Sequence, residues 1–194
     1  KKIGAVNTIS NVKGHLKGTN TDSSGFLRSL KTLNFSPKNK IIALLGSGGS
    51  ARALLAGLAG AGALSVMVNN RTAERAEKLV TEFSQFFPET KLEAVTLQTI
   101  KETTLDLLVN TTTVGMFSSG LPVDIMECQE ISILADLIYS PRKTSLIKQA
   151  EKMGIPSLNG IGMLLYQGCE SFTFWTGKRA PEEAMHNRLL SLID

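Results

Sequence analysis

IIALLGSGGSARA, residues 41–53, joins a continuous apolar run to a glycine-rich loop. The apolar run is typical of a strand that is buried on both faces of a sheet, and Ser50 to Ala61 continues as a helix rich in Ala and Leu. Further strand and helix patterns alternate from there to the end of the sequence. This order predicts an α/β fold with a doubly wound, Rossmann-like parallel sheet.

The expected elements follow from hydrophobic periodicity and from turn residues. The expected strands of the sheet are 41–45, 64–68, 92–96, 107–110, 133–137 and 155–158, and the expected helices are 50–61, 72–86, 144–152, 161–175 and 181–192. Before them we expect two short strands, 5–9 and 14–19, with Asn11 and Gly14 supplying turn chemistry. A helix capped by Asp22 or Ser23 then leads to a linker at 36–39.

The glycine-rich loop has the sequence context of a dinucleotide-binding site, because it follows a buried strand and opens a helix. Glycines permit a tight turn and close approach of the backbone to a pyrophosphate, whose charge meets free N–H groups at the helix N-terminus. Small Ala51 and Ala53 let the helix pack near the strand. We therefore expect cofactor contacts from Gly46, Ser47, Gly48, Gly49, Ser50 and Ala51. A glycine-rich turn without a ligand is the alternative.

The end of the second strand indicates which cofactor this loop would take. An NAD site places an acidic residue there to bind the ribose hydroxyls, but this sequence has Asn69-Asn70-Arg71-Thr72, with Arg75 one helical turn later. Arginine forks can bind a 2′-phosphate, and Thr72 can both cap the helix and donate a hydroxyl hydrogen bond. The predicted cofactor is NADP. As alternatives, Arg71 is mere surface charge, and Arg75 pairs with Glu74 or Glu82.

Composition limits the other functions. The chain has 194 residues and a net charge of +4, but its basic residues are dispersed, which argues against nucleic acid and favours an anionic small molecule. No apolar run is long enough to span a bilayer and no secretory signal opens the sequence, so we expect a cytoplasmic protein that binds no membrane. Cys128 and Cys169 lack metal-site spacing, and no metal site is expected.

Six short motifs together resemble the shikimate dehydrogenase family, the NADP-dependent shikimate 5-dehydrogenases, over nearly the whole chain. They are Ala5-Val6-Asn7-Thr8, Asn20-Thr21-Asp22, Gly46-x-Gly48-Gly49, Asn70-Arg71-Thr72-x-x-Arg75, Asn110-Thr111-Thr112-x-x-Gly115-Met116, and Gly160-Ile161-Gly162-Met163 followed by Gln167. The resemblance implies reversible reduction of 3-dehydroshikimate to shikimate by NADPH, in the pathway to the aromatic amino acids.

The resemblance also implies roles for individual residues. Asn7 and Asp22 would bind shikimate hydroxyls, with Asp22 paired to a catalytic lysine, and Tyr139 and Gln167 would be further substrate contacts. On the cofactor side it implies contacts from Asn70, Thr111, Thr112, Leu137, Gly160 and Met163. Plainer roles stay open for four of these residues: a strand end for Asn7, a helix cap for Asp22, a polar helix face for Gln167 and core packing for Met163.

One part of the family pattern does not occur in this sequence. The family's N-terminal segment carries serines that hold the substrate carboxylate and a lysine in a VTxPxK-like motif, and Lys1, Lys2 and Lys13 lack that context. We therefore expect residues 1–36 to be the end of a substrate-binding domain with a linker helix, 37–160 the NADP-binding domain, and 161–194 closing helices. Catalysis would then need the N-terminal segment as a partner.

Three other interpretations stay open. The parent enzyme could be a quinate/shikimate dehydrogenase, or a fusion with a dehydroquinate dehydratase. A non-catalytic module that senses NADPH is the alternative from another class of protein. Such a sensor has no use for Asn7, Asp22 and Gln167 and should ignore shikimate. Oligomeric state does not follow from the sequence.

Overall fold

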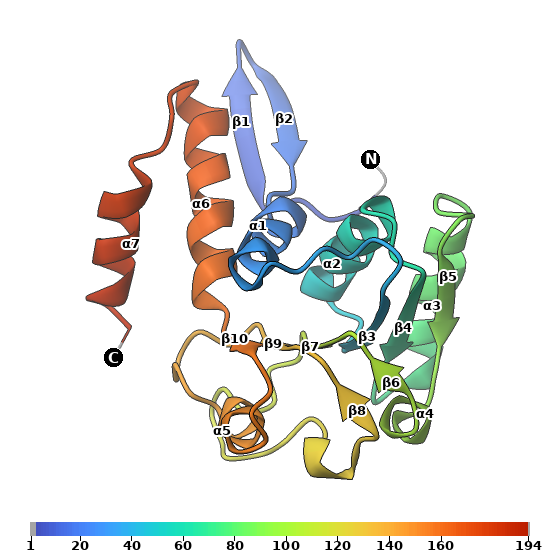
Figure 1. Ribbon diagram of the computed structural model, residues 1–194. Coiled ribbons are helices and arrows are strands. Elements are labelled where there is room, and N and C mark those ends of the chain that lie inside the picture. Colours follow the sequence, from blue (N-terminus) through green and yellow to red (C-terminus); the bar gives the residue numbers. More distant parts are fainter. Residues whose placement is uncertain (1–2, 194) are drawn as a thin grey trace.

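The computed structural model describes residues 3–193, and its centre is a six-stranded sheet in which neighbouring strands are parallel (Figure 1). In spatial order the strands are β10 (Ser157–Leu158), β9 (Leu134–Asp136), β7 (Leu107–Asn110), β3 (Ile41–Leu45), β4 (Ser65–Asn69) and β5 (Lys91–Ala94). The chain builds outward from β3 through β4 to β5, then returns to β7 and builds the other half. This confirms the predicted doubly wound parallel sheet. Its strand order reverses between β3 and β7, and sheets of this kind bind ligands at such a point.

Helices cover both faces of the sheet. Four pack on one face: α1 (Asp22–Leu30), α2 (Gly49–Gly60), α3 (Ala73–Ser84) and α6 (Ile161–Thr176). On the other face are α4 (Leu97–Lys101) and α5 (Ser145–Lys152). Successive residues of β3 alternate between the two cores, with Ile42 and Leu44 in the first and Ala43 and Leu45 in the second. Because helices cover both faces, the part of the sheet that stays open to a ligand is the edge where the strands end.

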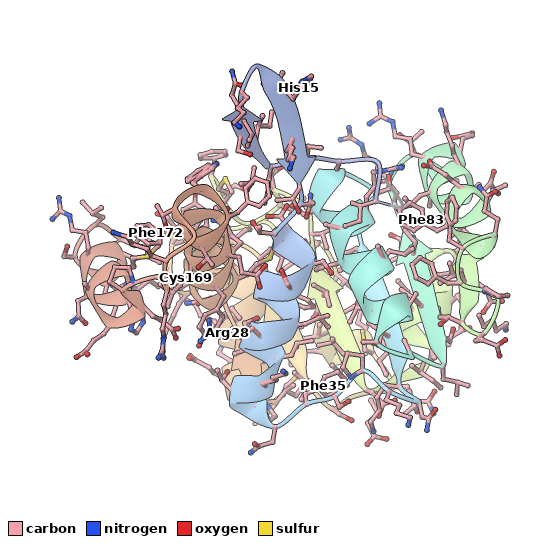
Figure 2. All side chains as sticks on the ribbon, turned by 90° about the horizontal axis from the view of Figure 1, so that it is seen from above. His15, Arg28, Phe35, Phe83, Cys169 and Phe172 are labelled. Carbon is pink, nitrogen blue, oxygen red and sulfur yellow. The ribbon has the colours of Figure 1, made fainter. Side chains whose placement is uncertain are left out.

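The helices of the first face lie side by side, and α7 (Glu182–Leu190) flanks them on the outside (Figure 2). Their backbones come close at glycines. A Cβ added to Gly25 of α1 would lie 2.7 Å from the backbone nitrogen of Gln167 on α6. Phe83 of α3 packs between α2 and α3 with no exposed surface (Figure 2). Tight packing of α1 against α6 fixes Asp22 and Gln167 relative to each other.

A hairpin projects from this layer near the N-terminus (Figure 1). Strands β1 (Thr8–Val12) and β2 (His15–Thr19) pair antiparallel around a two-residue turn, in which Lys13 and Gly14 both have positive φ. The chain turns only at Lys13 and Gly14, so residues 10–12 pair within β1 and this strand runs 8–12 instead of the expected 5–9. The Asn11 side chain accepts the Gly14 N–H from within β1.

Several short elements were not predicted from the sequence. Helix α4 and the paired strands β6 (Thr104–Leu105) and β8 (Glu130–Ile131) are too short to show periodicity. The expected cap of α1 was also wrong, because Thr21 occupies the N-cap position and Asp22 is the first helical residue.

Two predicted absences can be compared with the structure. No helix within residues 3–193 is long and apolar enough to cross a membrane. The same residues contain no group of three or more His, Cys, Asp or Glu side chains that could hold a metal ion, and Cys128 and Cys169 are free thiols.

Candidate functional site

The glycine-rich loop lies at the end of β3 and leads into α2, as predicted. Helix α2 starts at Gly49, with Gly48 at its N-cap position and no side chain capping it. Across the described residues, no acceptor is bonded to the backbone N–H groups of Ser47, Gly48, Gly49, Ser50 and Ala51, since the first bond into the helix runs from Arg52 N to Gly48 O. Ala51 and Ala53 are fully buried under this turn. Free N–H groups and the helix dipole make the loop an anion site.

The glycines of this loop differ in whether the fold requires glycine at their positions. Gly46 has a φ of +111°, and a Cβ there would lie 2.5 Å from Thr111 Oγ1, so only glycine fits. A Cβ on Gly48 or Gly49 would meet nothing within 4 Å. The space in front of α2 is therefore open, and the backbone around it is available to a ligand.

The turn after β4 presents two arginines. Arg71 and Arg75 are exposed, and neither side chain forms a hydrogen bond or ion pair within residues 3–193. Thr72 occupies the N-cap position of α3 without using its hydroxyl as a cap, and Asn70 Nδ2 donates to Thr72 O at 2.8 Å, which shapes the turn. The alternative pairing of Arg75 with Glu82 is wrong, because Glu82 pairs with Arg52 of α2. Two free guanidinium groups beside an open loop suit a second phosphate.

The ends of β7 and β9 complete this edge of the sheet. Thr111 Oγ1 donates to Leu45 O at 2.7 Å, which joins the end of β7 to the end of β3. Gly160 opens α6 directly against β9, where an added Cβ would lie 2.6 Å from the carbonyl carbon of Leu137. Thr112 and Leu137 are half-buried at the same edge. The predicted cofactor residues therefore follow the neighbouring strands β4, β3, β7 and β9, except Gly160 and Met163, which come after the edge strand β10 at the start of α6.

A second polar cluster lies where α1 meets the hairpin and α6. Asn7 Nδ2 donates to Asp22 Oδ1 at 2.8 Å and to Thr21 Oγ1 at 3.1 Å, while Asn7 Oδ1 accepts the Thr21 N–H at 3.0 Å. Thr21 Oγ1 donates to Gln167 Oε1 at 3.4 Å. Three of the four predicted substrate residues are thus joined, with Thr21 as the link.

Asp22 is under-satisfied in this cluster. Its Oδ2 has no hydrogen-bond donor among the described residues, and no lysine of residues 3–193 forms an ion pair with it. Burial raises the pKa of the Asp22 carboxyl above its usual value, and the hydrogen bond from Asn7 only partly opposes this shift. Lys13 is exposed in the hairpin turn, and Lys1 and Lys2 lie outside the described residues. The free oxygen is ready for a cation or a hydroxyl donor.

Tyr139 and Met163 stand apart from that cluster. Tyr139 is exposed after β9 and bonds to none of the other predicted substrate residues. Met163, in the first turn of α6, is 9% exposed and belongs to the first core cluster. This agrees with the alternative that Met163 packs in the core. Helix α6 therefore starts at the sheet edge that carries the predicted cofactor residues, and it brings Gln167 to the polar cluster around Asn7, Thr21 and Asp22.

Three functional neighbours were missed from the sequence. Thr8 and Thr21 belong to the quoted motifs without an assigned role, and Ser171 lies outside them. The hydroxyls of Thr8 and Ser171 are 2.6 Å apart, and both are buried behind Asn7. Ser171 follows Gln167 by four residues, so helical spacing alone could have placed it on the same face.

Asp136 was also missed. It is 1% exposed at the end of β9, and its carboxylate accepts hydrogen bonds from Asn110, Thr144 and the Ile138 N–H. A carboxylate within the apolar run ILADLI was the available signal, because acidic side chains are almost never fully buried unless paired.

A separate hollow of about 1020 Å³ lies between α1, α6 and α7, away from these residues. Arg28 lines it, but this guanidinium already stacks over Tyr166 at 4.3 Å and pairs with Glu182 at 2.5 Å. We place the site at the edge of the sheet, where the N–H groups of residues 47–51 and the guanidinium groups of Arg71 and Arg75 have no partner within residues 3–193.

Comparison with known proteins agrees with this geometry. Residues 29–116 match the family model described as shikimate / quinate 5-dehydrogenase, and residues 160–190 match the shikimate 5′-dehydrogenase C-terminal domain. A shikimate dehydrogenase (NADP(+)) of Geobacter metallireducens is 40% identical over 197 residues, covering 98% of this chain and 69% of the relative.

Solved structures give the same result. The shikimate 5-dehydrogenase of Thermus thermophilus, in complex with NADP(H) and shikimate, has a TM-score of 0.86 and 36% identity, covering 99% of this chain and 70% of that one. The quinate dehydrogenase of Corynebacterium glutamicum, in complex with NAD, has a TM-score of 0.90 at 28% identity, covering 98% and 69%.

The fold and its edge define a dinucleotide-binding oxidoreductase of the Rossmann-like class. Within that class the relatives decide the family. The chain belongs to the shikimate dehydrogenase family.

Proposed function

We propose that this chain binds NADP and takes part in the reversible, NADPH-dependent reduction of 3-dehydroshikimate to shikimate in aromatic amino acid biosynthesis. The observation that supports the cofactor most strongly is the pairing of two anion sites, the free N–H groups of residues 47–51 and the free guanidinium groups of Arg71 and Arg75. NADP carries two separate phosphate groups that match these two sites, a pyrophosphate and a 2′-phosphate. We further propose that the protein is cytoplasmic.

The cofactor contacts that we propose follow the strand ends. The pyrophosphate is held by Gly46, Ser47, Gly48, Gly49, Ser50 and Ala51. The adenosine 2′-phosphate is held by Asn70, Arg71, Thr72 and Arg75. The nicotinamide end is bordered by Thr111, Thr112, Leu137, Gly160 and Met163. Of these, Met163 supports the others from within the first core cluster. No acidic side chain follows β4 directly to repel the 2′-phosphate.

The substrate contacts that we propose are Asn7, Asp22, Tyr139 and Gln167. Asn7 holds Asp22 by a hydrogen bond of 2.8 Å, so the free Oδ2 of Asp22 keeps a fixed direction. Gln167 Nε2 has one N–H bonded to Leu164 O and one left for a ligand. Polar groups held in place suit a ring with several hydroxyls, because an unmatched buried polar group is costly.

When bound, NADPH supplies the hydride. The chain's own part is to hold the ring hydroxyls at Asp22 and Gln167 and to orient the proton-transferring group at Asp22 Oδ2. We propose that a lysine ammonium binds there, supplied by the family's N-terminal segment, and that catalysis needs this segment. Residues 37–160 would form the cofactor domain, which contains all six strands of the sheet, and 1–36 and 161–194 would form the substrate side.

The cofactor proposal is tested by calorimetric titration of the chain with NADP⁺ and with NAD⁺ at fixed salt. We expect preference for NADP⁺, and a loss of roughly 10- to 100-fold in NADP⁺ affinity for Arg71→Ala, because a charge-assisted hydrogen bond contributes about 1.5–3 kcal/mol. NAD⁺ binding should not change. Arg179→Ala, which removes an exposed arginine elsewhere, is the matched control. Equal affinity for both cofactors in the wild type would contradict the proposal.

Shikimate separates this proposal from a non-catalytic NADPH sensor. We expect the chain joined to the family's N-terminal segment to oxidise shikimate and form NADPH, and Asn7→Ala to slow this reaction because Asp22 loses its support. If that longer protein binds NADP⁺ but leaves shikimate unchanged, the sensor interpretation is favoured. Tighter binding of quinate than of shikimate would instead favour the quinate/shikimate dehydrogenase interpretation.

A further inference from the structure

Asp136 is a buried carboxylate that no step of the proposed reaction uses. It lies at the end of β9 and is 1% exposed. Its Oδ1 accepts from Asn110 Nδ2 at 2.9 Å and from the Ile138 N–H at 3.2 Å, while its Oδ2 accepts from Thr144 Oγ1 at 2.6 Å. Burial raises the pKa of Asp136, and these three donors oppose that shift. Burial of a carboxyl is costly, so its position calls for an explanation.

The first donor leads to the cofactor loop after β7. Asn110 is fully buried, and its Oδ1 accepts both the Thr112 N–H at 3.0 Å and the Thr112 hydroxyl at 2.7 Å. Thr112 Oγ1 accepts the Val114 N–H in turn, at 3.1 Å. One continuous chain of hydrogen bonds therefore runs from Asp136 to the loop 111–114.

The chemistry of Asp136 sets the direction of this chain. Asp136 Oδ1 accepts from both the Ile138 N–H and the NH₂ group of Asn110, so this NH₂ group is held facing Asp136. The amide oxygen of Asn110 is then forced to face Thr112.

The second donor leads to the start of α6. The Ile138 N–H is held by Asp136, and Ile138 O accepts the Gly160 N–H at 3.0 Å. Gly160 is the residue that packs on the backbone of Leu137. The third donor, Thr144, caps α5 by accepting the Ile147 N–H at 3.2 Å. Three segments at one edge of the sheet thus depend on one carboxyl group.

We propose that Asp136 is the positioning residue for the nicotinamide end of the site, holding the loop 111–114 and the Leu137–Gly160 contact in one arrangement. This rests on the proposed function, because it assumes that NADP binds at this edge. Asp136 touches neither cofactor nor substrate and acts through Asn110 and Ile138.

The test compares Asp136→Ala and Asp136→Asn with Asp124→Ala. Asp124 is the matched control, because its carboxylate also accepts from a backbone N–H and a side-chain amide, at Met126 and Gln149, away from the cofactor edge. Each protein is titrated with NADP⁺ and NAD⁺ well below its unfolding temperature. Hydrogen exchange of the Thr112 amide is followed in the ligand-free chain.

We expect Asp136→Ala to weaken NADP⁺ and NAD⁺ by the same factor, about tenfold, which corresponds to roughly one lost hydrogen-bond contribution. The preference for NADP⁺ should stay unchanged, because Arg71 and Arg75 follow β4, on the far side of β3 from β9. Thr112 should exchange faster. Asp136→Asn should restore most of the affinity, because Asn Oδ1 can accept from Asn110 and Ile138 while Thr144 reverses its hydroxyl.

Two results would overturn the proposal. One is an unchanged Thr112 exchange rate in Asp136→Ala, which tests positioning even if no cofactor binds. The other is an equal loss of affinity in Asp124→Ala, which would show that general destabilisation is enough to explain the weaker cofactor binding. A wild type that binds neither cofactor would instead refute the proposed function, and the exchange rates would still decide the role of Asp136.

Discussion

Replacing Gly46 by alanine should damage the fold, whereas the same change at Gly48 should damage only cofactor binding. Gly46 has a φ of +111°, which an L-residue adopts at a cost of about 1–3 kcal/mol. The new Cβ would lie 2.5 Å from Thr111 Oγ1, so this hydroxyl must turn away from Leu45 O and lose a hydrogen bond of about 1 kcal/mol.

These two costs add to about 2–4 kcal/mol for Gly46→Ala. For a chain of this length, that lowers the unfolding temperature by roughly 5–15 °C. Gly48 has an ordinary φ of −77° and open space around its Cα, so Gly48→Ala should cost about 1 kcal/mol or less at this N-cap. Its methyl group would nevertheless occupy the space proposed for the pyrophosphate.

Thermal unfolding by circular dichroism and calorimetric titration with NADP⁺ measure the two effects separately. We expect a large fall in unfolding temperature for Gly46→Ala, and near-normal stability with at least tenfold weaker NADP⁺ binding for Gly48→Ala. Equal stability of the two variants would refute the reasoning from backbone geometry. Normal NADP⁺ affinity in Gly48→Ala would refute the placement of the pyrophosphate.

Further changes test the substrate cluster and the packing. Because the folded-state pKa of Asp22 lies above 3.8, the folded chain holds this proton more tightly than the unfolded chain, and stability falls as pH rises from below 3.8 through the folded-state pKa. Asp22→Asn should therefore raise the unfolding temperature at neutral pH and lose this advantage below pH 3.8; a difference that is constant with pH would argue against a raised pKa. Gly160→Ala should destabilise the chain by about 3 kcal/mol in urea unfolding, because its Cβ would meet the Leu137 backbone, while Gly48→Ala serves as the unhindered comparison. Phe83→Ala should cost about 3–5 kcal/mol and exposed Phe86→Ala much less, and similar values for both would contradict the burial of Phe83.

Much of the fold was predictable because its strongest signals are local. The run 41–45 and the glycines after it predicted β3, the loop and α2 together, since burial on both faces and a tight turn each restrict residue type. Short elements were not predictable. Strands β6 and β8 have two residues each, and only their pairing in space defines them.

The candidate site divides in the same way. Arg71 and Asp22 could be selected because their residue types carry charge that a ligand needs. Thr21 and Asp136 act by linking other residues over distances of up to 150 positions in the sequence, as Thr21 does with Ser171. Such contacts depend on how α1 packs on α6 and how β9 pairs with β7, which no local pattern reveals.

The central claim is that NADP binds across the ends of β4, β3, β7 and β9, and a ¹H–¹⁵N correlation spectrum of the chain titrated with NADP⁺ tests it most directly. We predict the largest shifts at the amides of Ser47–Ala51, Arg71–Thr72 and Thr111–Thr112. Shifts confined instead to the hollow between α1, α6 and α7, around Arg28 and Tyr166, would contradict the account.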